Sequence, residues 1–179
     1  MSPPNGVLPF PDRVMGWLGA AARRNPEPLP GPCGIAAYAR VGWARSSPVA
    51  LEPRLRQLVT QLAAVRSGCA YCAHYGRHVG LRGGVPAAAL DGVTDHARSS
   101  HFSERERAAL ALADALTRFT AADGGFAAEI LERARCHLPE QQIMDLVALV
   151  AAEHFFDPVT GALGRDARTS TPQDDRPMR

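Results

Sequence analysis

The chain has 179 residues, of which 46% are hydrophobic and 6% aromatic, and its formal net charge at pH 7 is +2. That length fits one ordinary domain with a core of its own. The near balance of charge disfavours a dedicated nucleic-acid surface or a polybasic membrane anchor. The longest uninterrupted apolar run covers residues 146–152, far short of the ~20 residues that a transmembrane helix needs.

The first residues show neither an early basic region nor an apolar stretch, so we read no secretory signal there. Four cysteines are too few for a disulfide scaffold. We therefore expect a cytoplasmic protein in a reducing compartment. In that setting a close cysteine pair more often serves catalysis or metal binding than structure.

Residues 1–50 hold nine of the 15 prolines. Pro26, Pro28, Pro30 and Pro32 forbid a long helix in the middle of this stretch. We predict an irregular lead-in with short helices that packs on the core.

Helical periodicity begins at Pro53, a residue type that suits a first helical position. Apolar residues then recur at helical spacing through residue 65, and Gly68 ends this helix. A second helix is predicted from Cys69 to about Leu81, where two consecutive glycines stop it.

The third predicted helix has the strongest start signal, because Ser103 and Glu106 form a capping box before an apolar periodic run. A further helix is expected over residues 126–135. Pro139 opens the last helix, whose residues 143–152 are apolar nearly all round and should be buried.

The pattern predicts an all-α fold, since no alternating strand pattern exceeds four residues. We assign residues 51–165 to one helical domain. Residues 166–179 are polar and predicted to be a disordered tail.

Cys69 and Cys72 form a Cys-x-x-Cys pair at the start of the second predicted helix. Unpaired backbone amides and the positive helix end favour a thiolate there. Such settings lower a cysteine pKa from ~8.5 to ~3.5–7.5. The spacing places both sulfurs on one side of the first turn, close enough for a disulfide, which is the minimum for reversible two-electron thiol chemistry.

Other uses of the pair are weighed against this one. A c-type haem site needs a histidine where Ala73 stands, and a thioredoxin-like motif should follow a strand. Zinc could take the pair with His74 or His78, although a second ligand pair is missing. The pair could also be merely structural. Cys33 and Cys136 are interpreted as small buried hydrophobic residues.

The stretch from residue 51 to 86 resembles the AhpD-like, carboxymuconolactone decarboxylase superfamily, and the resemblance extends over about residues 35–165. The matching segments are Pro53-Arg54-Leu55, Leu58-Val59, Gly68-Cys69-Ala70-Tyr71-Cys72, Val85-Pro86 after a glycine break, and later Phe102–Leu110 and Ala151–Phe156.

The resemblance implies an AhpD-like helical fold that assembles as a homotrimer or hexamer, and an alkylhydroperoxidase activity with no further cofactor. In that scheme Cys72 attacks a peroxide and becomes a sulfenic acid. Cys69 then closes the disulfide, and a lipoyl protein or a thioredoxin-like dithiol restores the pair.

The chain departs from the family's proton relay at two positions. The family's glutamate, twelve residues before the first cysteine, is Gln57 here, and its histidine, four residues after the second, is Gly76. Glutamine hydrogen-bonds but takes up no proton at neutral pH. Nearby residues that could replace the relay or line a pocket are Tyr75, His74, His78, Glu153 and His154.

Helical geometry ranks these candidates. At roughly 100° per residue, Gly76 shares the face of Cys72, whereas His74 and His78 point away and read as a solvated or interface pair. Glu153 and His154 lie on the last, buried helix and could reach a pocket or a subunit interface; His154 also reads as a core histidine.

We therefore take a thiol-dependent peroxidase or dithiol–disulfide oxidoreductase as the leading hypothesis. The alternative is a non-redox helical oligomer or binding protein that keeps a degenerate site. A decarboxylase-type lyase is a weaker third, since such members of the family lack the cysteine pair.

Overall fold

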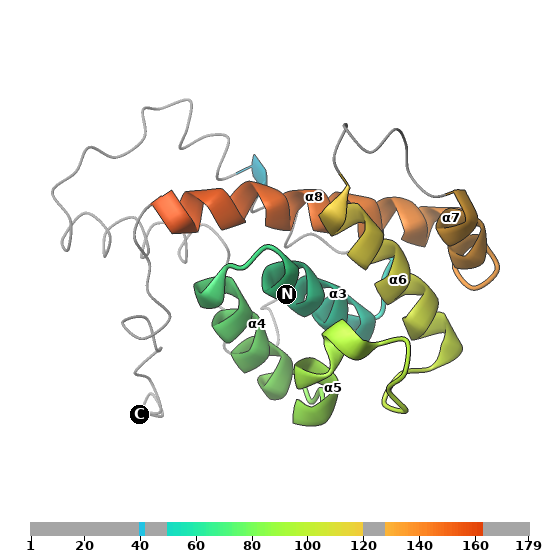
Figure 1. Cartoon of the computed structure of the whole chain (residues 1–179), viewed down its shortest axis with the longest axis horizontal. Coiled ribbons are helices and arrows are strands. Elements are labelled where there is room, and N and C mark those ends of the chain that lie inside the picture. Colours follow the sequence, from blue (N-terminus) through green and yellow to red (C-terminus); the bar gives the residue numbers. More distant parts are fainter. Residues whose placement is uncertain (1–39, 42–49, 120–127, 163–179) are drawn as a thin grey trace, which may run out of the picture. The chain divides into compact units, whose positions relative to one another are not determined.

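A computed structural model describes residues 40–41, 50–119 and 128–162, with side chains as far as residue 156 (Figure 1). The chain divides into two compact units, Met1–Pro48 and Val49–Arg179, and the helices described below belong to the second. The predicted N-terminal short helices, the start of the helix over residues 126–135 and the C-terminal tail fall outside the described residues.

The described part of the second unit is helical, and no strand occurs in it, which confirms the all-α prediction. The elements in chain order are α3 (Pro53–Arg66), α4 (Ala70–Arg82), α5 (Ala87–Asp91), the 3₁₀ helix η1 (Val93–Asp95), α6 (Glu104–Arg118), α7 (Ala128–Arg135) and α8 (Glu140–Ala162).

The start signals in the sequence work as expected. Pro53 occupies the first turn of α3. At the start of α6, the Ser103 side chain accepts from the backbone N–H of Glu106, and the Glu106 carboxylate accepts from the backbone N–H of Ser103 at 2.9 Å. Both bonds of the capping box are therefore formed, and they satisfy backbone donors that the helix itself leaves unpaired.

Helix α3 is the centre of the unit and contacts α4, α6 and α8 (Figure 1). Its residues 58–64 are all buried, so this stretch has no solvent-facing side. Leu58, Val59 and Leu62 are fully buried and belong to the core. A helix enclosed on several sides needs hydrophobic residues all round, which makes the polar exceptions on α3 informative.

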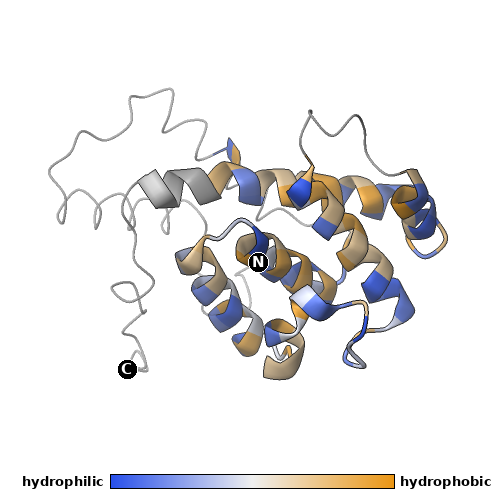
Figure 2. Cartoon of the chain, in the orientation of Figure 1, coloured by the Kyte–Doolittle hydropathy of each residue, from blue (hydrophilic) through white to orange (hydrophobic). Residues whose placement is uncertain are grey.

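Helix α8 is coloured hydrophobic over much of its described length, whereas α4 alternates between hydrophilic and hydrophobic residues (Figure 2). Ile143, Leu146, Leu149 and Val150 of α8 are buried in the core, whereas Met144, Ala148 and Ala151 are exposed. The stretch 143–152, predicted to be buried as a whole, is therefore buried on one side only. No helix within the described ranges combines the length and the apolar character needed to cross a membrane.

Helix α5 and η1 are additions to the predicted elements. Leu90 of α5 is buried, and its side-chain carbons lie 2.8–2.9 Å from the position that a Cβ on Gly80 would take. The absence of a side chain at Gly80 therefore lets α5 pack directly against α4.

Candidate redox site at the start of α4

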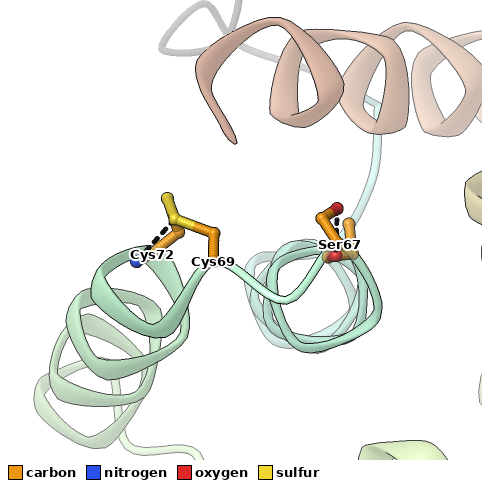
Figure 3. The surroundings of a disulfide bond; sticks show 4 residues. Ser67, Cys69 and Cys72 are labelled. Atoms are coloured by element: carbon orange, nitrogen blue, oxygen red, sulfur yellow. Dashed lines mark hydrogen bonds between the residues drawn. A yellow bond between two sulfur atoms is a disulfide. The ribbon is translucent and has the colours of Figure 1, made fainter. Parts of the chain in front are cut away.

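Cys69 and Cys72 are joined by a disulfide, with their Cα atoms 5.2 Å apart (Figure 3). Both residues are half-buried. Gly68, with a φ of 71°, follows α3 and turns the chain into the pair; glycine adopts this left-handed conformation at little cost. The predicted proximity of the two sulfurs is confirmed.

Cys69 is the N-cap of α4, and its sulfur accepts a hydrogen bond from the backbone N–H of Cys72 at 3.2 Å. A cap acceptor satisfies one of the free amides at a helix start, where the positive end of the dipole favours negative charge. The contact places the sulfur of Cys69 at the positive end of α4, a position of the kind that favours a thiolate.

The two relay positions lie on the helices that build this site. Gln57 is half-buried on α3, and Gly76 is buried on α4. Tyr75 is half-buried and stacks on Tyr71, with ring centroids 6.3 Å apart and planes 12° from parallel. Tyr71 precedes Cys72 by one residue and Tyr75 follows it by three, so the stacked pair lies within one helical turn of Cys72.

Gln61 is a residue of the site that the sequence analysis missed. It is only 4% exposed, and its Oε1 atom lies 2.8 Å from the position that a Cβ on Gly76 would take. Gln61 and Gly76 lie on different helices, so their contact could not be recognised before α3 and α4 were packed together. The only available signal was a polar residue within the apolar stretch of α3.

His74 is exposed and His78 is half-buried. With Cys69 and Cys72 linked to each other, the zinc set considered above is not assembled, and the described ranges contain no group of three or more His, Cys, Asp or Glu side chains placed to hold a metal ion.

Helix α8 contacts both α3 and α4. Glu153 is 1% exposed on this helix, whereas His154 is half-buried. Glu153 follows Leu149 and Val150 by four and three residues, so it shares their buried face. Of the two candidates on α8, Glu153 is therefore the one that is enclosed.

Cys136 does not match its interpretation as a buried residue, because it is exposed and free. It directly follows α7, whose last residue is Arg135. Cysteine is among the residue types most often buried, so residue type alone predicted the wrong environment here.

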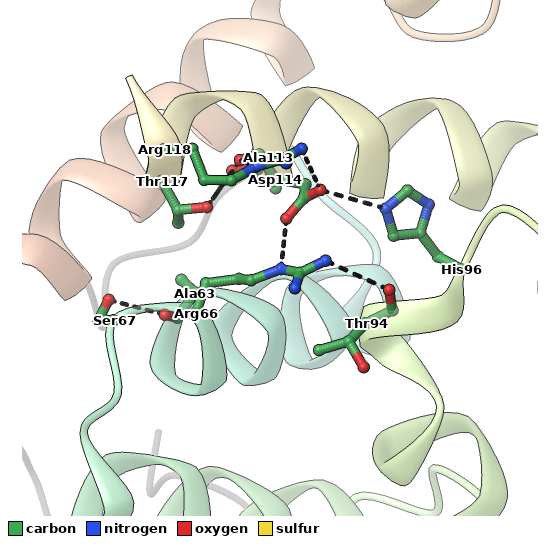
Figure 4. Close-up of polar contacts among 9 residues, drawn as sticks. All are labelled: Ala63, Arg66, Ser67, Thr94, His96, Ala113, Asp114, Thr117 and Arg118. Atoms are coloured by element: carbon green, nitrogen blue, oxygen red, sulfur yellow. Dashed lines mark hydrogen bonds and ion pairs between the residues drawn. The ribbon is translucent and has the colours of Figure 1, made fainter. Parts of the chain in front are cut away.

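A second polar cluster ties the end of α3 to α6 (Figure 4). Asp114 on α6 is buried and accepts from Arg66 Nε and from Arg118 Nη2, both at 2.6 Å. Arg66 also donates to the carbonyl of Thr94 at 3.3 Å. The cluster fixes the last turn of α3 three residues before the cysteine pair.

His96 completes this cluster, with its Nε2 atom 3.9 Å from Asp114 Oδ2. Burial lowers the pKa of His96 below its usual value, and the positive charge of Arg66 acts in the same direction, while the carboxylate of Asp114 opposes it. The fold therefore favours the neutral form of the His96 imidazole.

The comparisons with known proteins agree with the sequence resemblance. The family model for carboxymuconolactone decarboxylases matches residues 35–115. No curated protein gives a match.

Three solved structures share the fold. A cysteine-to-alanine variant of the debrominase Bmp8, in complex with 2,3,4-tribromopyrrole, is 18% identical with a TM-score of 0.67, covering 76% of this chain and 72% of its own. The same debrominase without ligand is 17% identical with a TM-score of 0.68, covering 87% and 80%. A protein of unknown function from Agrobacterium tumefaciens, suggested to be the antioxidant defence protein AhpD, is 22% identical with a TM-score of 0.67, covering 86% and 96%.

At these identities the solved structures show a shared fold, and the family model matches a little under half of the chain. Together with the cysteine pair at the start of α4, they agree with the resemblance of this chain to the AhpD-like, carboxymuconolactone decarboxylase superfamily.

Proposed function

We propose that the protein is a thiol-dependent peroxidase that reduces hydroperoxides through Cys72 and Cys69. The observation that carries the proposal is the disulfide itself, held at the start of α4 with the sulfur of Cys69 as helix cap. Two cysteines that reach bonding distance without disturbing the helix can cycle between dithiol and disulfide.

In the oxidative half of the cycle, the thiolate of Cys72 attacks the terminal oxygen of the hydroperoxide. A sulfur–oxygen bond forms, the oxygen–oxygen bond breaks, and the alkoxide takes a proton and leaves as an alcohol. The thiolate of Cys69 then attacks the sulfur of Cys72, and hydroxide leaves and becomes water. Two thiols are oxidised to a disulfide for each peroxide reduced.

In the reductive half, an external dithiol of the lipoyl or thioredoxin type returns two electrons. Thiol exchange is faster when the leaving sulfur is the more stable thiolate. The cap hydrogen bond stabilises Cys69 in that form. The external thiol is therefore proposed to attack Cys72 and to release Cys69.

The family's proton relay has no acid–base group at Gln57 or Gly76. Among the residues suggested as replacements, Glu153 is supported best, because it is a carboxylate enclosed on the helix that contacts both α3 and α4. Desolvated carboxylates are typical proton carriers at catalytic sites.

Peroxide consumption by the full-length protein, with dihydrolipoamide as reductant, tests the proposal. Cys72→Ser should abolish turnover. Cys69→Ser should form a sulfenic acid at Cys72 that dimedone traps, while Cys136→Ser, which removes the exposed free thiol, serves as the matched control. Turnover in Cys72→Ser equal to that of the wild type would overturn the proposal, as would a wild-type protein that consumes no peroxide.

Reductive debromination is a second candidate, because solved structures of a debrominase share the fold and two stacked tyrosines lie within one helical turn of Cys72. Here a thiolate would take the bromine from an aromatic ring, the ring carbon would take a proton, and the second thiol would expel bromide and close the disulfide. Bromide release from 2,3,4-tribromopyrrole, measured with the same variants, separates the two reactions. A lyase would act on its substrate even with both cysteines replaced. A binding protein would neither consume peroxide nor release bromide.

The expected trimer or hexamer is likewise a proposal. Light scattering coupled to size exclusion would give the mass of the assembly directly.

A further inference from the structure

Gln61 is a buried polar side chain inside the helix at the centre of the unit. It is 4% exposed, and its Oε1 atom has no hydrogen-bond partner in the part of the chain that the structure describes. Leaving a buried acceptor unsatisfied costs folding free energy, so such atoms call for an explanation. A hydrogen-bond donor that enters during the reaction would supply one.

The position of Gln61 relative to Cys72 follows from its contact with α4. Its Oε1 atom lies 2.8 Å from where a Cβ on Gly76 would be. Gly76 follows Cys72 by four residues, so the two lie one above the other on one helix face. Side chains on a helix lean toward its N-terminus. A side chain at residue 76 would extend from this position toward Cys72. The amide oxygen of Gln61 therefore lies where the first atoms of that side chain would be.

We propose that Gln61 Oε1 accepts a hydrogen bond from the hydroxyl group of the hydroperoxide while Cys72 attacks the oxygen of that group, and that Gln61 thereby selects substrates whose reacting oxygen carries a hydrogen. This inference rests on the proposed function. It also accounts for Gly76, because a side chain at that position would displace the amide.

The hydrogen bond to Gln61 persists while Cys72 attacks the hydroperoxide. The sulfur of Cys72 bonds to the hydroxyl oxygen, the oxygen–oxygen bond breaks, and the alkoxide leaves and takes its proton from solvent. The hydroxyl proton stays on the oxygen that is now part of the sulfenic acid, so Gln61 accepts from the same group before and after the reaction. A neutral amide oxygen suits this role because it accepts the hydrogen bond without removing the proton.

The two half-reactions separate this role from a structural one. Reduction of the disulfide by a dithiol involves no hydroxyl donor, so Gln61 has no part in it. Gln61→Leu should slow oxidation of the reduced protein by tert-butyl hydroperoxide at least about tenfold, and should leave disulfide reduction by dihydrolipoamide within about twofold of the wild type. Both rates are measured in single turnover by stopped flow.

Three further variants make the test specific. Gln61→Glu keeps an acceptor at the same place and should retain more of the oxidation rate than Gln61→Leu. Gly76→Ala leaves Gln61 chemically intact but pushes its amide aside, so it should slow oxidation alone. Thr60→Val, which removes the neighbouring buried hydroxyl on α3, is the matched control and should change neither rate.

The outcomes are distinguishable. Oxidation of Gln61→Leu at the wild-type rate would overturn the role of Gln61 and leave the proposed function standing. Equal losses in both half-reactions would show a structural effect and would also overturn it. A wild-type protein that hydroperoxide does not oxidise would overturn both proposals together.

Discussion

The sulfur of Cys69 accepts a hydrogen bond from the backbone N–H of Cys72 at 3.2 Å, so one cysteine of the pair caps the helix that carries the other. The position of the pair at a helix start predicts activated thiols, and the family resemblance implies that Cys72 is the attacking one. The cap contact shows that the two sulfurs are not equivalent. The contact suits Cys69 to leave as a thiolate when the disulfide is reduced and to attack Cys72 when the disulfide forms again. The attack of Cys72 on the peroxide stays a prediction.

The first prediction concerns the two thiol pKa values. In the reduced protein, Cys72→Ser reports on Cys69, and Cys69→Ser reports on Cys72. We expect the alkylation rate of Cys69 to reach its midpoint below ~8.5 and below that of Cys72, because the cap contact and the helix dipole stabilise its thiolate. Iodoacetamide kinetics from pH 5 to 10, with Cys33→Ser and Cys136→Ser in the background of both variants, give the two values. A midpoint for Cys69 at or above that of Cys72 would contradict the prediction.

The second prediction concerns the close packing of α4 against α5. Gly80→Ala would place a Cβ 2.8–2.9 Å from two side-chain carbons of Leu90. Overpacking of this kind costs about 1–3 kcal/mol of unfolding free energy. Gly83→Ala is the matched control, because its nearest neighbours lie at 3.4 Å, and it should stay within about 0.5 kcal/mol of the wild type. Urea unfolding followed by circular dichroism measures both, and equal stabilities of the two variants would count against the packing argument.

Much of this unit could be predicted from local signals. Pro53 and the Ser103–Glu106 box mark helix starts because their chemistry acts within one turn, and the cysteine pair is three residues apart in sequence. Helix α5 was not predicted, because five residues are too few to show the hydrophobic periodicity of a helix.

The features that were missed depend on how distant segments pack. Gln61 lies against Gly76 only because α3 and α4 are adjacent. Asp114 accepts a hydrogen bond from Arg66, which is 48 residues away in sequence. Residue type alone also gave the wrong prediction at Cys136, which is exposed. Contacts across helices are decided by packing, which no periodicity in a single segment encodes.

The third prediction concerns the carboxylate that holds the end of α3. Asp114→Asn removes the negative charge that Arg66 and Arg118 share. Because Asp114 is buried while both arginines are partly exposed, we expect a loss of about 1–3 kcal/mol, less than for a fully buried ion pair. Asp95→Asn, an exposed carboxylate near Arg98, should change stability by less than about 0.5 kcal/mol. Chemical denaturation measures the unfolding free energy of both variants. The prediction is wrong if Asp114→Asn and Asp95→Asn lose the same amount of stability.

The fourth prediction follows from the lowered pKa of His96, whose first cause is burial. In the unfolded chain this imidazole takes up a proton near pH 6.5, whereas in the folded protein it does so only at a lower pH. The folded state therefore has its full stability above about pH 6.5 and loses it as the pH falls through the folded pKa of His96. Protonation would also add positive charge beside Arg66 and Arg118. Thermal midpoints measured from pH 8 to pH 5 should fall less steeply in His96→Gln than in the wild type, whereas His101→Gln, at an exposed histidine, should keep the wild-type slope. An unchanged slope in His96→Gln would show that another group governs the acid sensitivity of the fold.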